Sequence, residues 1–221
     1  MVFLDPVRPA SMAFPLPDRL PIFVAATLAL TLTPGPAVLF IVARSAGSGR
    51  RAGLLSVAGI GLGNAVHALA TALGLAALLA SSPVAFATVK WLGAGYLVFL
   101  GARKLLGRGP DVASSLAEVR PPGAAVLRQA FLVAVLNPKT ALFFLAFLPP
   151  FADPARGAVV AQLVVLGAIF LAIAVTTDCA YAFLANGVGS VLRRHPGFAR
   201  GERIVSAVVY VGLGVLAALA A

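Results

Sequence analysis

The chain has 221 residues, of which 61% are hydrophobic and 11% are charged, and its mean hydropathy is +1.01. A soluble domain has about half of its residues apolar and about a quarter charged. A chain of this length cannot bury the excess apolar surface in its own interior, so part of that surface must face lipid. The composition therefore indicates an integral membrane protein.

The formal net charge of +10 does not indicate a nucleic-acid-binding protein. No run of Lys and Arg is long enough to form a nucleic-acid patch. The basic residues instead flank the apolar segments, as they do in membrane proteins. Cys179 is the only cysteine, which excludes an intrachain disulfide and a multi-cysteine metal site. We therefore expect no nucleic-acid partner, no metal and no cofactor.

The first segment, residues 1–19, is predicted to be an N-terminal tail. It carries Asp5, Pro6 and Pro9, and no short apolar core with a small-residue cleavage site follows them, so a signal peptide is not expected. Met12 is an alternative start. The tail is accordingly either disordered or lies upstream of the true first residue.

Membrane-spanning segments account for most of the remaining chain. A helix needs about 20 apolar residues to cross the hydrocarbon core. Thr33-Pro34-Gly35-Pro36 and Asn137-Pro138-Lys139 interrupt the first and the fourth such segment, and the polar residues 107–128 form the longest loop. The sequence thus predicts an all-α membrane protein with six spans, of which the first and fourth are broken: 20–43, 52–80, 84–102, 129–152, 157–186 and 204–221.

The distribution of Lys and Arg predicts the orientation. Most of them follow the first, third and fifth spans, whereas the opposite side has only Arg8, Arg19, Lys90 and Arg156. Because basic loops stay in the cytoplasm, we expect the basic loop 107–128 to be cytoplasmic and both termini to lie outside.

The two interrupted spans resemble each other. PGPAVLFI (34–41) aligns without a gap on PKTALFFL (138–145), with proline on proline and phenylalanine on phenylalanine. Residues 20–106 and 129–221 would each supply three helices, and an odd number makes the two halves enter the membrane in opposite directions. Inverted repeats with matching broken helices are a recurrent plan of transporters, with the substrate site at the breaks.

Two charged residues lie deep in the predicted spans. Asp178 is the only carboxylate in any span, and such a group is expensive in lipid and commonly marks a proton or ion route. Lys139 lies about ten residues into its span, which is roughly 15 Å deep at 1.5 Å per residue. Either charge has a structural alternative: Asp178 could make a structural hydrogen bond, and an ion pair between the two could simply join their helices.

Other polar residues could share the same site. His67 follows Gly59 and Gly63 at spacings of four, so all three lie on one helix face, where the glycines would allow close packing. His67 is then either a packed hydrogen-bonding residue or part of a proton or substrate site. Further candidates are Asn64, three residues before His67 on an adjacent face, Asn137, just before the second break, and Tyr181, one turn after Asp178.

These motifs, taken in order, resemble the lysine exporter (LysE-type) translocator family, in particular its homoserine/threonine exporter branch. They are TPGP at 33–36, G-x-x-x-G-x-x-x-H at 59–67, KWLGAGYLVFLG at 90–101, NPKTALFFLAFLPPF at 137–151 and D-x-x-Y at 178–181. The resemblance runs from about residue 20 to the C-terminus. The matching motif residues are Pro34, Gly35, Gly59, Gly63, His67, Gly93, Tyr96, Asn137, Pro138, Lys139 and Asp178.

The resemblance implies a bacterial inner-membrane exporter that moves amino acids or their derivatives outward in exchange for protons. Basic-amino-acid exporters of the family tend to carry an acid near position 64, where this chain has Asn64, so a neutral substrate is expected. The expected substrate-binding residues are Pro34, Gly35, Asn64, His67, Asn137, Pro138, Lys139 and Tyr181, and the expected proton-coupling residues are Asp178 and His67.

Two other classes of function were weighed. An intramembrane aspartyl protease needs two membrane carboxylates, and the predicted spans hold one, so an enzyme is not expected. A channel, or a structural membrane subunit without coupled transport, is the alternative reading. The expected partners are an amino-acid substrate, protons and membrane lipid, and a homodimer is left open.

Overall fold

The computed structural model describes residues 19–106, 122–194 and 196–219, and within these residues it is helical, without strands. This confirms the all-α prediction. The tail before residue 19 and most of the loop after residue 106 lie outside the described residues. The elements are α1 (Leu20–Leu32), α2 (Pro36–Ser48), α3 (Arg50–Ser81), α4 (Pro83–Leu105), α5 (Gly123–Val135), α6 (Pro138–Phe147), η1 (Pro149–Phe151), η2 (Pro154–Arg156), α7 (Val159–Arg194) and α8 (Pro196–Leu219).

Both predicted breaks are present. α1 and α2 meet at a bend of 50°, and α5 and α6 meet at a bend of 46°. In each case a proline occupies the first turn of the second half-helix, Pro36 in α2 and Pro138 in α6. Proline is tolerated there because the first helical N–H groups have no intrahelical acceptor in any case. The prolines therefore begin new helices and do not distort continuous ones.

Several helix ends differ from the predicted span limits. α5 begins at Gly123, so residues 123–128, predicted to be loop, are helical. α7 continues to Arg194, and α8 begins at Pro196 rather than near residue 204. The predictions ended spans at charged residues, where the apolar core of the membrane ends. A helix continues beyond that limit because Arg and Lys are good helix formers in water.

The length and composition of the described helices identify fewer spans than the sequence predicts. α3 over Arg50–Gly74 and α7 over Val159–Ala185 are each long and apolar enough to cross a membrane. Each bent pair would add one broken span, which gives up to four among the described residues, and α8 contributes a shorter apolar stretch, Ile204–Leu216. The chain is thus a multi-pass membrane protein, and the count of six spans remains a prediction.

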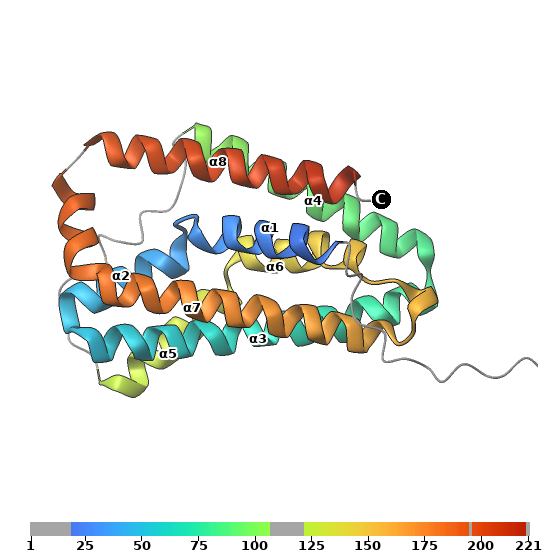
Figure 1. Cartoon of the computed structure of the whole chain (residues 1–221), viewed down its shortest axis with the longest axis horizontal. Coiled ribbons are helices and arrows are strands. Elements are labelled where there is room, and N and C mark those ends of the chain that lie inside the picture. Colours follow the sequence, from blue (N-terminus) through green and yellow to red (C-terminus); the bar gives the residue numbers. More distant parts are fainter. Residues whose placement is uncertain (1–18, 107–121, 195, 220–221) are drawn as a thin grey trace, which may run out of the picture.

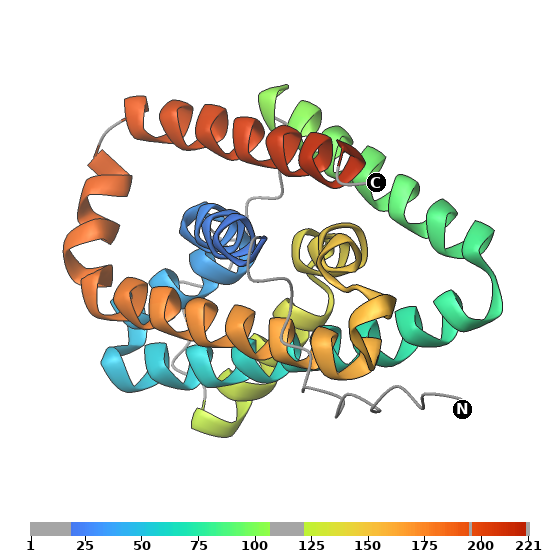
Figure 2. The same cartoon turned by 45° about the vertical axis from the view of Figure 1, so that its right-hand side comes forward.

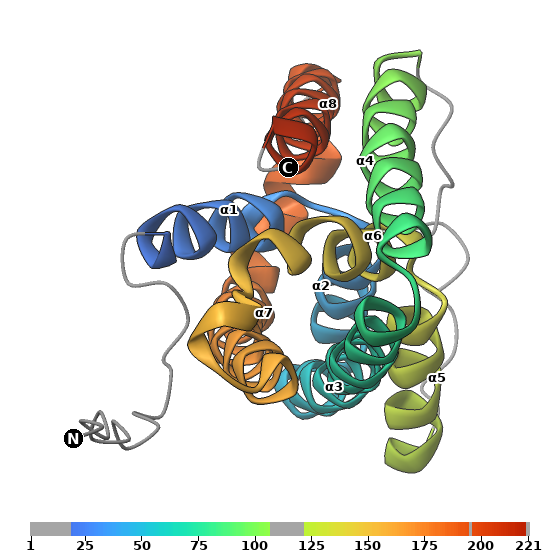
Figure 3. The ribbon, with the colours of Figure 1, turned by 90° about the vertical axis from the view of Figure 1, so that its right-hand side faces the viewer.

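The long helices form two antiparallel pairs (Figure 1). α3 runs beside α7, with Gly53 next to Ala182 and Gly167 next to Ala68, so increasing numbers on one helix meet decreasing numbers on the other. α4 runs beside α8 in the same way, with Gly101 next to Val211. Turning the molecule shows the half-helices α1 and α6 between these two pairs (Figures 2 and 3). The two breaks therefore lie inside the helix bundle.

Glycines on α3 set its distance from α5. A side chain at Gly59 would meet the carbonyl oxygen of Leu127, and one at Gly63 would meet the Cβ atom of Ala134 at 2.5 Å. Both approaches are closer than a Cβ atom tolerates, so the two backbones pack directly together. Close approach through small residues is the usual way in which membrane helices associate. The predicted role of these glycines in helix packing is confirmed.

Candidate functional site

A small cavity lies where the two breaks approach each other. Its volume is about 40 Å³, which is room for about one water molecule and far less than the roughly 300 Å³ of a small ligand pocket. The site is therefore too small to hold a substrate in this conformation. The lining residues come from both breaks and both long central helices: Leu30, Thr31, Gly35, Ala37, Val38, Ile60, Asn64, Asn137, Lys139, Thr140, Phe170, Ala174 and Asp178.

A larger hollow of about 600 Å³ lies on the surface of α4, but it contains no predicted site residue. It is lined by Val84, Ala87, Thr88, Trp91 and Leu92, of which Trp91 and Leu92 are exposed. An apolar surface of this kind is expected where a membrane protein faces lipid. The small central cavity, which is lined by Lys139 and Asp178, is the candidate functional site.

Lys139 joins the second break to the first. Its ammonium group donates hydrogen bonds to the carbonyl oxygens of Leu30 at 2.8 Å and Thr33 at 2.7 Å. These carbonyls end α1, where the helix leaves its last acceptors without intrahelical donors and where the helix dipole is negative. The carbonyl oxygen of Leu30 also accepts a hydrogen bond at 3.2 Å from the backbone N–H of Thr33. The buried cation therefore adds a second donor there and interacts favourably with the negative end of the helix dipole.

Gly35 lies beside this lysine. A Cβ atom at Gly35 would lie 3.4 Å from Cδ and 3.5 Å from Nζ of Lys139. The φ angle of Gly35 is −146°, an extended conformation that any residue adopts. Both distances are ordinary van der Waals contacts, so neither space nor backbone conformation requires glycine at this position.

Asn137 begins α6. Its side-chain oxygen accepts a hydrogen bond at 3.1 Å from the backbone N–H of Lys139, which makes it the N-cap of this half-helix. The cap fixes the first turn of α6 and with it the direction in which the Lys139 side chain leaves the helix. Pro138 is exposed and Pro34 is half-buried; neither lines the cavity, and both act by setting the breaks.

α2, the half-helix that follows the first break, begins with backbone N–H groups that no side chain caps. Its residues Ala37 and Val38 line the cavity. The N–H groups at the start of a helix have no intrahelical acceptor and carry the positive end of its dipole. The cavity therefore presents anion-binding groups from α2 beside the ammonium of Lys139.

Asp178 and Asn64 face this cavity from α7 and α3. Asp178 is 6% exposed and Asn64 is 6% exposed. Within the described residues, neither side chain makes a hydrogen bond, although the charge of Asp178 interacts with that of Lys139. Buried polar groups in proteins are nearly always satisfied. These two side chains therefore present unused hydrogen-bonding groups to the cavity.

His67 and Tyr181 do not line the cavity. The Nε2 atom of His67 lies 3.1 Å from the carbonyl oxygen of Ala134, near the end of α5, and its ring stacks on Phe144. Tyr181 donates a hydrogen bond at 2.7 Å to the carbonyl oxygen of Leu32, at the end of α1. Each residue contacts a carbonyl oxygen near the end of the half-helix that precedes a break, although the carbonyl of Ala134 also accepts a backbone hydrogen bond from Asn137.

Tyr210 of α8 was not predicted from the sequence. Its ring centroid lies 5.4 Å from Nζ of Lys139, and the side chain is 6% exposed. A cation over an aromatic face at this distance is attracted by the ring quadrupole. Nothing in the sequence distinguishes this tyrosine, because it stands in an apolar stretch without polar neighbours.

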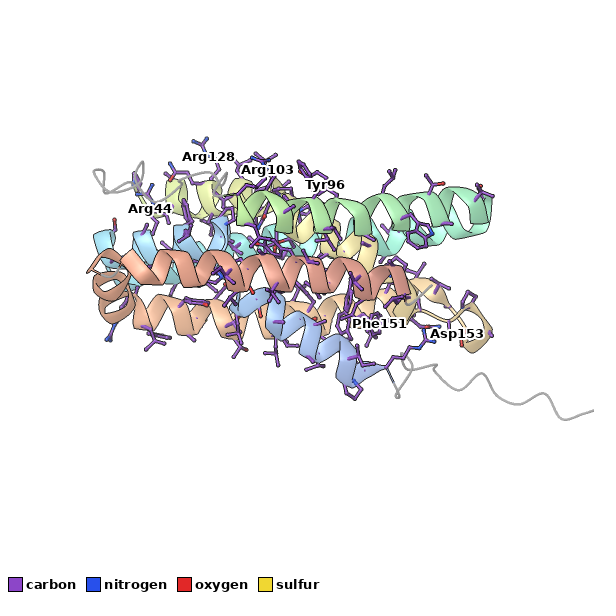
Figure 4. The ribbon with its side chains drawn as sticks, turned by 90° about the horizontal axis from the view of Figure 1, so that it is seen from above. Arg44, Tyr96, Arg103, Arg128, Phe151 and Asp153 are labelled. Carbon is purple, nitrogen blue, oxygen red and sulfur yellow. The ribbon has the colours of Figure 1, made fainter. Side chains whose placement is uncertain are left out.

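Two motif residues of α4 lie away from the site. Gly93 packs against Ala146 of α6, where an added Cβ would come within 2.7 Å of the alanine Cβ. Tyr96 lies on the outer side of α4, near Phe99 (Figure 4). Gly93 therefore has a packing role, and Tyr96 faces outward.

The chain shares its pattern with a family of membrane transporters. The family model for LysE type translocators matches residues 28–221. The chain belongs to the LysE type translocator family. Both breaks and all residues that line the cavity lie within the matched residues. Members of the family are transporters and not enzymes, so the expected absence of an enzymatic role is shown by family membership.

Similar proteins occur in several bacteria. The translocator is 34% identical over 206 residues to an uncharacterized membrane protein of Pseudomonas aeruginosa, covering 90% of this chain and 94% of that protein. It is 31% identical over 198 residues to an uncharacterized membrane protein of Vibrio cholerae, covering 90% and 95%. It is 32% identical over 131 residues to the leucine efflux protein of Salmonella typhimurium, covering 59% and 62%. No solved structure matches this chain.

Proposed function

We propose that this chain exports small neutral amino acids across the bacterial inner membrane in exchange for protons. One observation carries the proposal. A small cavity between two broken helices holds a buried cation, a buried carboxyl group and free helix-start N–H groups. An amino acid has complementary groups, a carboxylate and an ammonium, at one end of the molecule.

The carboxylate of the substrate would bind at the start of α2 and to Lys139. Half-helix N-termini favour anions, and an ammonium group nearby adds a charge-assisted hydrogen bond. In this conformation Lys139 is bonded to the carbonyls of Leu30 and Thr33. Substrate binding would thus compete with these carbonyls for the lysine and loosen the contact between α6 and the end of α1.

The ammonium of the substrate would bind at Asp178, with Asn64 as a neutral hydrogen-bonding partner. Asp178 would also carry the proton, because a substrate cation and a proton cannot both occupy one carboxylate. Competition between the substrate and the proton for this one carboxylate is the simplest way to couple export of the substrate to uptake of the proton. Asn64 carries no charge, which supports a neutral side chain on the substrate and accords with the name of the leucine efflux relative. A preference for homoserine or threonine is the other neutral-substrate possibility, and the export panel below distinguishes them.

We assign His67 and Tyr181 to positioning. Both bond to helix-end carbonyls beside the breaks, so they would control how the half-helices move. α3 runs antiparallel to α7, and α4 runs antiparallel to α8 (Figure 1). That arrangement supports an inverted repeat. In transporters built this way, one repeat moves against the other, and the site opens alternately to each side of the membrane.

The sidedness is also proposed. Arg44, Arg103 and Arg128 lie toward one end of the molecule, and Asp153 lies at the other (Figure 4). The positive-inside rule makes the arginine-rich end cytoplasmic. Substrate would enter from that end and leave at the end that carries Asp153.

The experiment is export from cells that are loaded with single amino acids by feeding dipeptides. Cells expressing the wild type should excrete one or more neutral amino acids faster than cells with empty vector, and excrete lysine no faster. Lys139→Met and Asp178→Asn should each lose most of this export, whereas Tyr96→Phe, on the outer face of α4, should retain it. Equal excretion by wild-type and empty-vector cells for the whole panel would refute the proposal. An external concentration of the amino acid that never rises above its concentration inside the cells would favour the channel.

A further inference from the structure

Six phenylalanine side chains form a continuous cluster between the cavity and one end of the molecule. Each is at most 5% exposed. They come from four different elements, α1, α6, η1 and α7. We call the set the phenylalanine column: Phe23, Phe143, Phe144, Phe147, Phe151 and Phe170.

The rings of the column are in contact from one end to the other. Phe170, which lines the cavity, lies 4.6 Å from Phe144 and 5.4 Å from Phe143, measured between ring centroids. Phe143 stacks on Phe147 at 4.9 Å, and Phe147 lies 5.0 Å from Phe151. Phe151 belongs to η1, at the end opposite Arg44 (Figure 4). The column therefore fills the route from the cavity to that end.

The outer end of the column is fastened by hydrogen bonds. Gln162, which is 1% exposed, accepts a bond at 2.8 Å from the backbone N–H of Asp153 and donates one at 2.9 Å to its carbonyl oxygen. Arg19, just before α1, donates a bond at 3.0 Å to the carbonyl oxygen of Pro150. The segment that carries Phe151 is thus held on both sides, to α7 and to the start of α1.

The other half of the chain has no matching aromatic set. In the alignment of the two breaks, Phe143, Phe147 and Phe151 correspond to Leu39, Ala43 and Gly47 of the first half. The cluster beside α2 is built mainly from aliphatic side chains; Phe40 is its buried aromatic member, and Tyr181 packs against it. Aromatic pairs add about 0.5–1.5 kcal/mol each beyond the burial of their area. Among the described side chains, aromatic packing is therefore concentrated toward the end that carries Asp153.

From this asymmetry we infer that the phenylalanine column is the gate that closes the substrate cavity toward the end carrying Asp153. The inference rests on the proposed function, under which this end is the exit. Opening requires η1 and Phe151 to leave the rings of α6 and α1, which requires the bonds of Gln162 and Arg19 to break. The gate would thus keep the site closed to the outside until substrate binding loosens α6.

The test measures whether the cavity is reached from that end by a membrane-impermeant maleimide. Cys179 is replaced by serine so that the chain has no other thiol, and Ala174→Cys places one thiol in the cavity lining. A second cysteine variant, Ala158→Cys, carries its thiol on an exposed residue just before α7. Labelling of this variant in sealed vesicles shows whether the end that carries Asp153 faces the outside or the inside of the vesicle. The rate of labelling at position 174 from that face is the readout.

We expect slow labelling of the parent protein, and labelling at least ten times faster when Phe151→Ala or Gln162→Ala is added. Phe40→Ala is the matched control, because Phe40 is a buried phenylalanine on α2 outside the column, and it should leave the rate from this face unchanged. Unaltered labelling in both gate variants, or equal acceleration by Phe40→Ala, would overturn the gate.

Labelling needs no substrate, so this result is separate from the proposed function. If Phe151→Ala or Gln162→Ala speeds labelling in a protein that exports no amino acid, the gate is supported and amino-acid export is refuted. If the wild type exports amino acids normally and neither Phe151→Ala nor Gln162→Ala changes labelling, amino-acid export is supported and the gate is refuted.

Discussion

Replacing Gly63 by alanine should force α3 and α5 apart at the site. The new Cβ atom would lie 2.5 Å from the Cβ atom of Ala134 and 2.9 Å from the carbonyl oxygen of Phe131. Packed carbon atoms lie about 3.5–4.0 Å apart, so the helices would have to separate by about 1 Å. Overpacking of this kind costs about 1–3 kcal/mol.

The separation also affects His67, because its Nε2 atom is bonded to the carbonyl oxygen of the same Ala134. Loss of a hydrogen bond costs about 0.5–1.5 kcal/mol, while the better helix propensity of alanine returns about 1 kcal/mol. We therefore expect Gly63→Ala to lower the free energy of unfolding by about 1–3 kcal/mol, since overpacking is the largest contribution.

The assay is unfolding of the purified protein in mixed micelles with increasing dodecyl sulfate, followed by circular dichroism. Gly61→Ala is the matched control on the same helix, because its Cβ atom would meet only Cγ2 of Val175, at 3.5 Å. It should leave stability unchanged or raise it by up to about 1 kcal/mol. Equal stability of Gly63→Ala and Gly61→Ala would refute the account of helix packing at the site.

Three further predictions concern individual side chains. Tyr210→Leu should raise the substrate concentration for half-maximal counterflow by about tenfold, the equivalent of a cation–π contact of roughly 1.4 kcal/mol, whereas Tyr210→Phe retains the ring and should stay within about twofold of wild type. Asn137→Ala should lower the free energy of unfolding by about 1 kcal/mol through loss of the α6 N-cap, measured by the same unfolding assay, and Asn137→Ser should recover most of that loss. His67→Gln retains a hydrogen-bond donor and should keep export with its pH dependence, whereas His67→Leu should lower stability; a changed pH profile in His67→Gln would restore His67 to the proton pathway.

The breaks were predictable because they depend on local chemistry. Proline removes a donor and fixes φ, and Asn is a strong N-cap, so their effect on the helix follows from a few neighbouring residues. The packing face of Gly59 and Gly63 was predictable for the same reason, since a spacing of four places residues on one side of a helix. Lys139 and Asp178 were identified because charges are rare in apolar spans, and both line the cavity.

The partners of these residues were not predictable. Lys139 bonds to the carbonyls of Leu30 and Thr33, about a hundred positions earlier in the chain, and main-chain carbonyls have no mark in a sequence. His67 shares a helix with Asn64, yet only Asn64 lines the cavity. Three residues in a helix correspond to a turn of about 300°, so a small rotation decides which side chain faces inward. That rotation is set by packing against α5 and α7.

Coupling of neutral amino-acid movement to protons through Asp178 is the central claim, and transport in proteoliposomes tests it most directly. A pH gradient is imposed across vesicles that contain the purified protein, with the exported amino acid at equal concentration on both sides. The account predicts that wild type concentrates the amino acid on the more acidic side, whereas Asp178→Asn exchanges labelled for unlabelled amino acid without concentrating it. Wild-type protein that leaves the amino acid at equal concentrations, or an Asp178→Asn variant that concentrates it as well as wild type does, would contradict the account.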